Sequence, residues 1–248
     1  MGLWVDKNAP RIEDLERMDQ NVRQVATAEQ IEVGGLIAEA QEEISSELKL
    51  YLERATGVPE PSLDDVAVTD RLRRWACLVA LSFLYRNAYF NQMTERYAAR
   101  WKEYVAQAER AKRENFEAGV GRVSKPVRRP AAPVVVAVSS GSMSTGAYFL
   151  CVSAANGDGD ESEASDVATL ATSATGGMQI QFGTGSNVAG WNVYAGGTAD
   201  AMVLQTLQPV APGAVWSTQT NIRTDGRSPG SGQTSDFVTK KCNRILRG

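Results

Sequence analysis

Residues 69–117 read TDRLRRWACLVALSFLYRNAYFNQMTERYAARWKEYVAQAERAKRENFE and contain neither glycine nor proline. Apolar side chains recur there every three or four residues, which is the spacing of one helix face. Thr69 is placed to cap the start, and Gly119 and Gly121 follow the end, where helices commonly terminate. The pattern predicts one very long helix, bent near Arg86 and about 70 Å in length. Because that length exceeds the diameter of a small domain, part of the helix is expected to contact other chains.

The remainder of the N-terminal half also has helical patterning, and the chain then changes character. Four regions are expected: a helical domain over residues 1–123, a proline-rich linker over 124–133, a β-sandwich over 134–223, and a flexible spacer with a C-terminal tail over 224–248. Trp75, Phe83, Tyr97 and Trp101 are the residues of the long helix that are expected to form its core or its contacts with other chains. The predicted fold class is therefore a multidomain α + β protein, with an all-α bundle built on one very long helix.

Glycine, serine, threonine, alanine and valine dominate the second half of the chain. Short apolar runs separated by glycine- and asparagine-rich turns are typical of strands in a β-sandwich. Seven strands are expected, at residues 134–138, 147–155, 167–171, 178–182, 191–195, 202–207 and 214–217. Tyr148 and Trp191 are the expected large side chains of the sandwich core.

Composition argues against most enzyme chemistry. The chain has no histidine, which removes histidine bases, triads and metal ligands together. Its three cysteines are far apart, without zinc-site spacing, and are expected to be reduced thiols. The acidic loop at residues 158–163 lacks the spacing of a calcium loop, and the glycines at 183 and 185 are expected to form a turn. No catalytic constellation, metal site or cofactor is therefore expected.

The charges are distributed unevenly along the chain. Residues 13–65 hold 14 acidic and 4 basic side chains, a net charge of −10, whereas residues 71–129 hold 14 basic and 5 acidic, a net charge of +9. Either the two halves of the helical domain complement each other, or one charged face meets a charged partner such as a neighbouring subunit or passing DNA. No aromatic-plus-basic motif favours sequence-specific DNA binding.

The N-terminal residues MGLWVDKNAP lack the basic and apolar regions of a signal peptide, and the longest apolar run is far shorter than the ~20 residues that span a bilayer. Synthesis and folding in the cytoplasm, without a membrane, are therefore expected.

The last residues, 236–248, read DFVTKKCNRILRG and alternate basic with apolar side chains. They follow a stretch rich in glycine and serine, so they are interpreted as a docking peptide, the alternative being a disordered terminus. The expected contact residues are Phe237, Val238, Arg244, Ile245, Leu246 and Arg247.

Residues 78–87 (LVALSFLYRN), which follow acidic early helices, resemble the long helix of tailed-phage head–tail connectors, also called adaptor or head-completion proteins. Residues 146–156 (GAYFLCVSAAN), with Glu161 and Ser165, resemble a strand pair of the immunoglobulin-like virion domains that are close to fibronectin type III. Residues 189–196 (AGWNVYAG) and 209–216 resemble two further strands of those domains, although the loop at 156–165 is more acidic than is usual.

The resemblance implies a structural virion protein of the phage neck that forms a dodecameric ring beneath the portal. The implied partners are the portal protein, neighbouring copies of the chain and the next neck or tail protein, with DNA only as passing cargo. The β-sandwich would project outward as decoration or bind capsid or fibres. In that family the C-terminal end often reaches the portal, which is the role expected of Phe237, Ile245 and Leu246 as anchors, with Arg244 and Arg247 as ionic contacts.

Two other classes of protein stay open. The β domain also fits a tail or fibre-attachment protein, since such domains occur there too. A cell-surface adhesin with a helical stalk is a further alternative, against which the expected lack of a signal peptide counts. An enzyme is the least favoured class.

Overall fold

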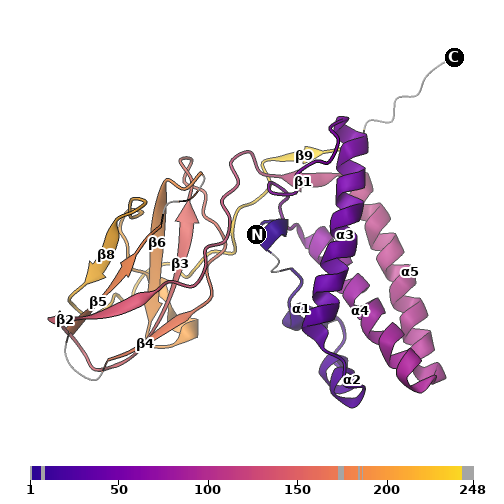
Figure 1. Ribbon diagram of the computed structural model, residues 1–248, viewed down its shortest axis with the longest axis horizontal. Helices are drawn as coiled ribbons and strands as arrows, with labels where there is room; N and C mark the ends of the chain where they lie inside the picture. The colour runs from indigo at the N-terminus through magenta and orange to yellow at the C-terminus, as the bar shows by residue number, and fades with distance from the viewer. Residues whose placement is uncertain (1, 7–8, 173–175, 184, 186, 242–248) are drawn as a thin grey trace. The chain divides into compact units, whose positions relative to one another are not determined.

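The structure, a computed structural model, describes residues 2–6, 9–172, 176–183, 185 and 187–241. It divides into two compact units, each visible in Figure 1. The helical unit comprises Trp4–Ser124 and the described residues from Ser235 onward. The β unit comprises Lys125–Thr234 together with Gly2 and Leu3. In sequence, the β unit is therefore an insertion between two segments of the helical unit.

The helical unit contains five α-helices in the described part of the chain. They are α1 (Ile12–Met18), α2 (Val22–Ala28), α3 (Val33–Thr56), α4 (Asp70–Gln92) and α5 (Glu95–Ala118), with a 3-10 turn at Trp4–Asp6. The Thr69 hydroxyl accepts a hydrogen bond from the Leu72 amide at 3.2 Å, so the predicted cap of the long helix is confirmed. The Glu32 carboxylate caps α3 by accepting from the amides of Gly34 and Gly35.

The predicted single helix over residues 69–117 is wrong, because the structure divides it into α4 and α5. Met93 adopts the left-handed conformation, with φ 55° and ψ 33°, and the extended Thr94 then begins α5. The two helices pack antiparallel, so that Trp75 lies against Phe116. The helix is not interrupted near Arg86, where a bend was predicted, because this residue lies inside α4.

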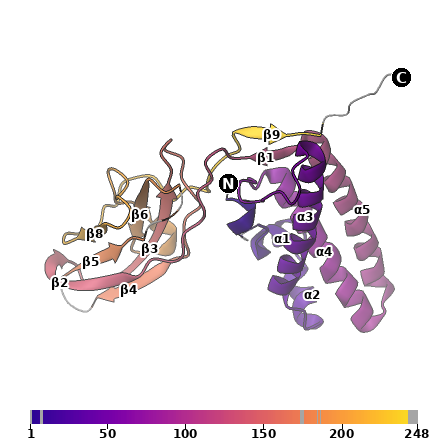
Figure 2. The ribbon, with the colours of Figure 1, turned by 45° about the horizontal axis from the view of Figure 1, so that its top comes forward.

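Burial explains why the chain reverses. Between Trp75 and Tyr85, α4 is buried on every face, which requires neighbours all around it. Figures 1 and 2 show α4 between α3 and α5. A straight helix would leave these side chains in water, at a cost of about 2 kcal/mol for each large one. The free energy gained by burying these side chains therefore exceeds the ~1–2 kcal/mol of strain at the one left-handed residue, Met93.

A two-stranded ribbon closes the helical unit. Strand β1 (Val120–Arg122) directly follows α5 and pairs antiparallel with β9 (Phe237–Thr239). On its other side, β1 is bonded to the segment before α4, where the Ala67 amide donates to the Gly121 carbonyl at 3.0 Å. Part of the segment predicted to be spacer and tail, residues 224–248, thus belongs to the helical unit.

The β unit consists of two antiparallel sheets. One has the order β2-β5-β8 and the other the order β4-β3-β6-β7. The strands are β2 (Val135–Met143), β3 (Gly146–Ala155), β4 (Ala168–Thr172), β5 (Gly176–Gln181), β6 (Gly190–Gly196), β7 (Val203–Leu204) and β8 (Val215–Thr218), with a 3-10 turn at Ala199–Ala201. Each of the seven predicted strands has a counterpart among them. The coarse prediction of a mixed α + β chain is confirmed.

Both sheets contribute to one hydrophobic cluster. Met178 and Ile180 of β5 lie in it with Leu150 of β3 and Val193 of β6, and all four are almost fully buried. Trp191 packs at its margin, stacked on Phe182 with ring centroids 5.4 Å apart. The expected core positions Tyr148 and Trp191 are thus both part of this packing.

Candidate functional site

The aromatic residues predicted for the long helix lie in the core of the helical unit. Trp75 is 2% exposed, and Phe83 and Tyr97 are likewise buried. Trp101 is partly buried against Tyr89, with ring centroids 5.9 Å apart. These side chains hold the helices together, so a surface for another chain must be formed by other residues.

The docking residues predicted in the C-terminal segment fall into two groups. Phe237 and Val238 lie in β9, where they are 44% and 54% exposed. The Arg122 guanidinium lies 5.7 Å from the centroid of the Phe237 ring. Arg244, Ile245, Leu246 and Arg247 lie outside the described residues.

A pocket adjoins this ribbon at the end of the helical unit where α3 and α5 end. The pocket has a volume of about 460 Å³, and its apolar wall is formed by Tyr51 and Phe116, whose rings stack at 4.4 Å. The Tyr51 hydroxyl donates to the Phe116 carbonyl at 2.9 Å and accepts from the Lys241 amide at 3.1 Å. Charged side chains surround these rings: Glu109, Lys112, Arg113, Glu117, Lys240 and Lys241.

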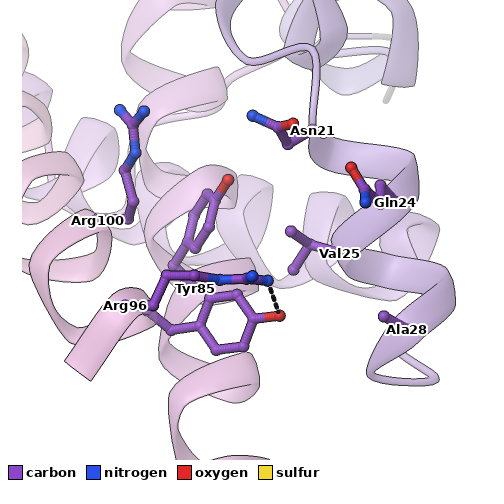
Figure 3. Close-up of a pocket in the computed structure, with 8 residues that line it drawn as sticks. Asn21, Gln24, Val25, Ala28, Tyr85, Arg96 and Arg100 are labelled. Carbon is purple, nitrogen blue, oxygen red and sulfur yellow. Dashed lines mark hydrogen bonds between the residues drawn. The ribbon is translucent and has the colours of Figure 1, made fainter. Parts of the chain in front are cut away.

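A second pocket, of about 310 Å³, lies between α2 and the α4–α5 hairpin (Figure 3). Asn21, Gln24, Val25 and Ala28 form the wall on the α2 side. Tyr85 of α4 and Arg96, Tyr97 and Arg100 of α5 form the opposite wall. Figure 3 shows Arg96 and Arg100 on the side of the pocket opposite Asn21 and Gln24, with Arg96 extended across to the Tyr97 hydroxyl.

The carboxylate of Asp19 holds the helices around this pocket together. Asp19 ends α1 and is 7% exposed. Its Oδ2 accepts hydrogen bonds from the hydroxyls of Tyr85 at 2.6 Å and Tyr104 at 2.9 Å. Its Oδ1 accepts from the Asn21 amide at 2.9 Å. Burial alone would raise the pKa of Asp19, but these hydrogen bonds outweigh it and lower the pKa below its usual range.

A second buried carboxylate holds the other tyrosine of the pocket. Glu29 follows α2 and accepts a hydrogen bond from the Tyr97 hydroxyl at 3.0 Å. The Arg96 guanidinium donates to the same hydroxyl at 2.7 Å and lies 4.7 Å from the ring centroid.

Burial and the Asp19 carboxylate raise the pKa values of Tyr85 and Tyr104, so both phenols stay protonated at neutral pH.

The pocket favours binding over catalysis. Guanidinium groups match the planar geometry of carboxylates and phosphates, so Arg96 and Arg100 suit an anionic group. The Tyr85 hydroxyl already donates to the buried Asp19 carboxylate and, with its raised pKa, is a poor proton donor. Burial raises the pKa of the Cys77 thiol to about 12 and that of Cys151 to about 11, which makes both thiols unreactive at neutral pH.

Two further properties concern the described part of the chain. It contains no group of three or more histidine, cysteine, aspartate and glutamate side chains able to hold a metal ion. Within the same residues, no helix combines the length and apolarity needed to cross a bilayer.

In the β unit, the acidic loop before β4 is attached to β3. The Glu161 carboxylate accepts hydrogen bonds from Ser153, from the Asn192 amide group at 3.1 Å and from the Tyr194 hydroxyl at 2.5 Å. The Arg227 guanidinium pairs with its other oxygen at 2.5 Å. Glu161 is therefore a structural residue that ties the loop to β3 and β6.

Sequence reasoning found neither the Asp19 network nor the arginine pocket. Asp19 is 66 residues from Tyr85 and 85 residues from Tyr104, and no local pattern connects such positions. Arg96 and Arg100 are one helical turn apart, a signal that was readable but usual for an exposed helix face. Only the antiparallel hairpin brings these groups together.

Comparisons with protein families, with curated proteins and with solved structures give no match to this chain.

Proposed function

We propose that this chain is a structural protein of a tailed-phage virion, an adaptor of the neck that docks on the portal and joins it to the next neck or tail protein. The resemblance of residues 78–87 to the connector helix supports the proposal. The protein would act by binding alone, as several copies arranged in a ring.

The observation that carries the proposal is the surface around β9. Phe237 and Val238 present apolar side chains there, and the cations Lys240 and Lys241 follow directly beside the aromatic pocket of Tyr51. Exposed apolar groups with adjacent cations are typical of a protein-binding surface whose partner carries acidic residues at its rim. Because β9 is bonded to β1, this surface is held rigidly on the helical unit, and little entropy would be lost on docking.

For the β unit, we propose an immunoglobulin- or fibronectin III-like sandwich. Seven antiparallel strands in two sheets around one core are consistent with that architecture. Its role would be to project from the neck and to contact capsid or fibres. A tail or fibre-attachment protein is the second candidate. The two antiparallel sheets of the β unit favour it equally, since that unit would then be the part that binds the partner.

Portal binding by surface variants tests the proposal. Replacing Phe237 and Val238 together by serine and threonine is expected to weaken co-sedimentation with the portal ring by about tenfold or more. The matched control is Leu207→Ser, which removes an 89% exposed apolar side chain from the β unit. Equal binding by both variants and the unmodified chain would contradict the assignment of this surface.

A deletion should begin at Cys242, because removing Phe237–Thr239 would also remove β9 and disturb the helical unit. Loss of portal binding in a chain lacking residues 242–248, with helical content unchanged, would support the predicted role of Arg244, Ile245, Leu246 and Arg247. Unchanged binding would restrict docking to the β9 surface.

A further inference from the structure

Strand β8 (Figure 1) is an edge of the sheet β2-β5-β8 in the β unit. The Phe182 amide donates to the Ala214 carbonyl at 3.1 Å, in the same register as the pairing of β5 with β8. Along an antiparallel pair, residues bonded to the partner strand alternate with residues whose backbone groups point away from it. Trp216 therefore exchanges hydrogen bonds with β5, whereas the N–H and C=O groups of Val215 and Ser217 point outward.

These outward groups have no partner within the described chain. Neither Val215 nor Ser217 takes part in any further backbone or side-chain hydrogen bond there, and both residues are exposed, Val215 by 51%. The other edges of the β unit are covered. Strands β2 and β4 lie next to each other, and β7 is bonded to a later segment, since the Leu204 amide donates to the Arg227 carbonyl at 3.0 Å.

The β8 edge also lacks the features that keep exposed edges apart. Such strands usually carry lysine, another charge or a proline, which hinder pairing with a further strand. Strands β2, β5 and β8 contain neither a charged residue nor a proline, and residues 201–222 are uncharged throughout. The edge can therefore approach its own copy without repulsion between like charges and without burying an ion.

We propose that β8 pairs antiparallel with β8 of a second copy of this chain, about a two-fold axis, so that two three-stranded sheets become one continuous sheet. Val215 of each copy would lie opposite Ser217 of the other, and each of these two pairs would exchange two N–H···O bonds. A register shifted toward the end of β8 would use fewer bonds, because the Gln219 carbonyl already accepts from the Ser142 amide at 2.7 Å.

Trp216 favours a second copy over a strand of unrelated sequence. In this register the two Trp216 residues lie opposite each other at the axis, in the non-hydrogen-bonded position where side chains approach most closely. Trp216 is partly buried against the hydrophobic cluster between the sheets. Pairing would bring the two indoles together and continue that cluster from one copy into the other.

This contact uses the β unit alone, so the inference goes beyond the proposed function and does not rest on it. Because β8 has only four residues, the interface is small, and small interfaces are typical of transient contacts. We expect weak association of separate chains, which becomes stronger where a partner holds several copies together.

Hydrogen exchange of the full chain tests the pairing residue by residue. The amides of Val215 and Ser217 are expected to exchange about tenfold or more slowly at millimolar than at low micromolar protein concentration, because only the second copy protects them. The amides of Trp216 and Thr218, which lie on the β5 side, are the internal control and should be protected at both concentrations.

Equal exchange of the Val215 and Ser217 amides at the two concentrations would overturn the proposal. Protection that appears only when portal protein is added would also overturn it, and would assign the edge to a strand of that protein.

Substitution of Ser217 is the second measurement. Ser217→Pro removes an outward N–H and places the proline ring where the partner strand approaches, but it keeps the N–H groups that bond to β5. Sedimentation velocity at millimolar concentration is expected to show self-association weakened about tenfold or more relative to the unmodified chain. The matched control Ser217→Ala keeps the N–H and should associate as the unmodified chain does.

An unmodified chain that is monomeric under these conditions, or equal association of the two Ser217 variants, would contradict pairing through β8. Protection of the Trp216 and Thr218 amides in Ser217→Pro checks that its strand is in place, and exchange in the unmodified chain decides the question if it is not. Both variants should bind the portal equally through the β9 surface, so failure of this inference and failure of the proposed function are separable.

Discussion

Asp19 is the residue on which the arrangement of α1, α2, α4 and α5 most depends. Its backbone amide caps the end of α1 by donating to the Leu15 carbonyl, and its carboxylate accepts from the Asn21 amide before α2 and from tyrosines of α4 and α5. Buried acceptors of this kind contribute most when every donor that they satisfy would otherwise be unpaired. The sequence offered no signal for it, because its partners are brought together only by tertiary structure.

Asp19→Ala is expected to destabilise the helical unit by about 3 kcal/mol, since the hydroxyls of Tyr85 and Tyr104 both lose their acceptor. Urea unfolding followed by far-UV circular dichroism measures the change. The control Glu114→Ala removes a half-exposed carboxylate that pairs with the exposed Arg110, and it should cost much less than Asp19→Ala. Equal losses from the two substitutions would contradict the role of Asp19.

Glu161 gives the β unit a dependence on pH. Burial alone would raise the pKa of Glu161, but hydrogen bonds from Ser153, Tyr194, Arg227 and Asn192 lower it below 4.5, the value of the unfolded chain. A carboxylate whose folded pKa is lowered stabilises the protein fully above its unfolded pKa and loses that stabilisation as the pH falls through the folded pKa.

Glu161→Gln is expected to destabilise the β unit by about 2 kcal/mol at neutral pH, with the difference from the unmodified chain shrinking as the pH falls from neutral through the lowered pKa of Glu161. Hydrogen exchange of amides in β3 and β6, measured across this range, reports on it. Asp225→Asn changes an 85% exposed side chain and should alter neither the stability of the β unit at neutral pH nor its dependence on pH. A destabilisation independent of pH would show that the carboxylate charge is not what matters.

At the scale of elements, the turn at Met93 decides the architecture of the helical unit. The apolar spacing of residues 69–117 correctly indicated helix on both sides of it, since helical periodicity is a local property. The reversal could not be read from spacing, because no glycine or proline marks it and a left-handed methionine is uncommon. The only local signal of a second helix start was Thr94 followed by Glu95, and the Thr94 side chain makes no capping hydrogen bond.

Met93→Gly is expected to stabilise the chain by up to about 1 kcal/mol, because glycine adopts positive φ without strain and Met93 is 67% exposed. The control Gln92→Gly places glycine at the last residue of α4 and should destabilise by about 0.5–1 kcal/mol. Thermal unfolding of both variants separates a hairpin from a continuous helix: in a continuous helix the two substitutions would cost the same.

For the whole molecule, the main finding is that the β unit is inserted into the helical unit. Composition showed where the chain changes character, near residues 124–133. It could not show that the chain returns, since pairing of β9 with β1 joins positions more than a hundred residues apart. The strands of the β unit were readable because alternation and turn residues are local signals, whereas the order of strands in each sheet was not.

Excising residues 125–234 and joining Ser124 to Ser235 through a short glycine–serine linker should leave the helical unit folded. The two ends are neighbours, because the Ser124 amide and hydroxyl both donate to Asp236 Oδ2, at 2.8 and 2.7 Å. Circular dichroism should show helix and one cooperative unfolding transition. A shortened chain without cooperative unfolding would mean that the helical unit depends on its insertion.

The proposal that this chain is a neck adaptor is tested most directly by the mass of its complex with the portal ring, measured by light scattering. The proposal predicts a stoichiometric complex with copy numbers consistent with twelve. Failure to associate with the portal, together with a stable trimer or hexamer of the chain alone, would contradict it and favour a tail or fibre protein.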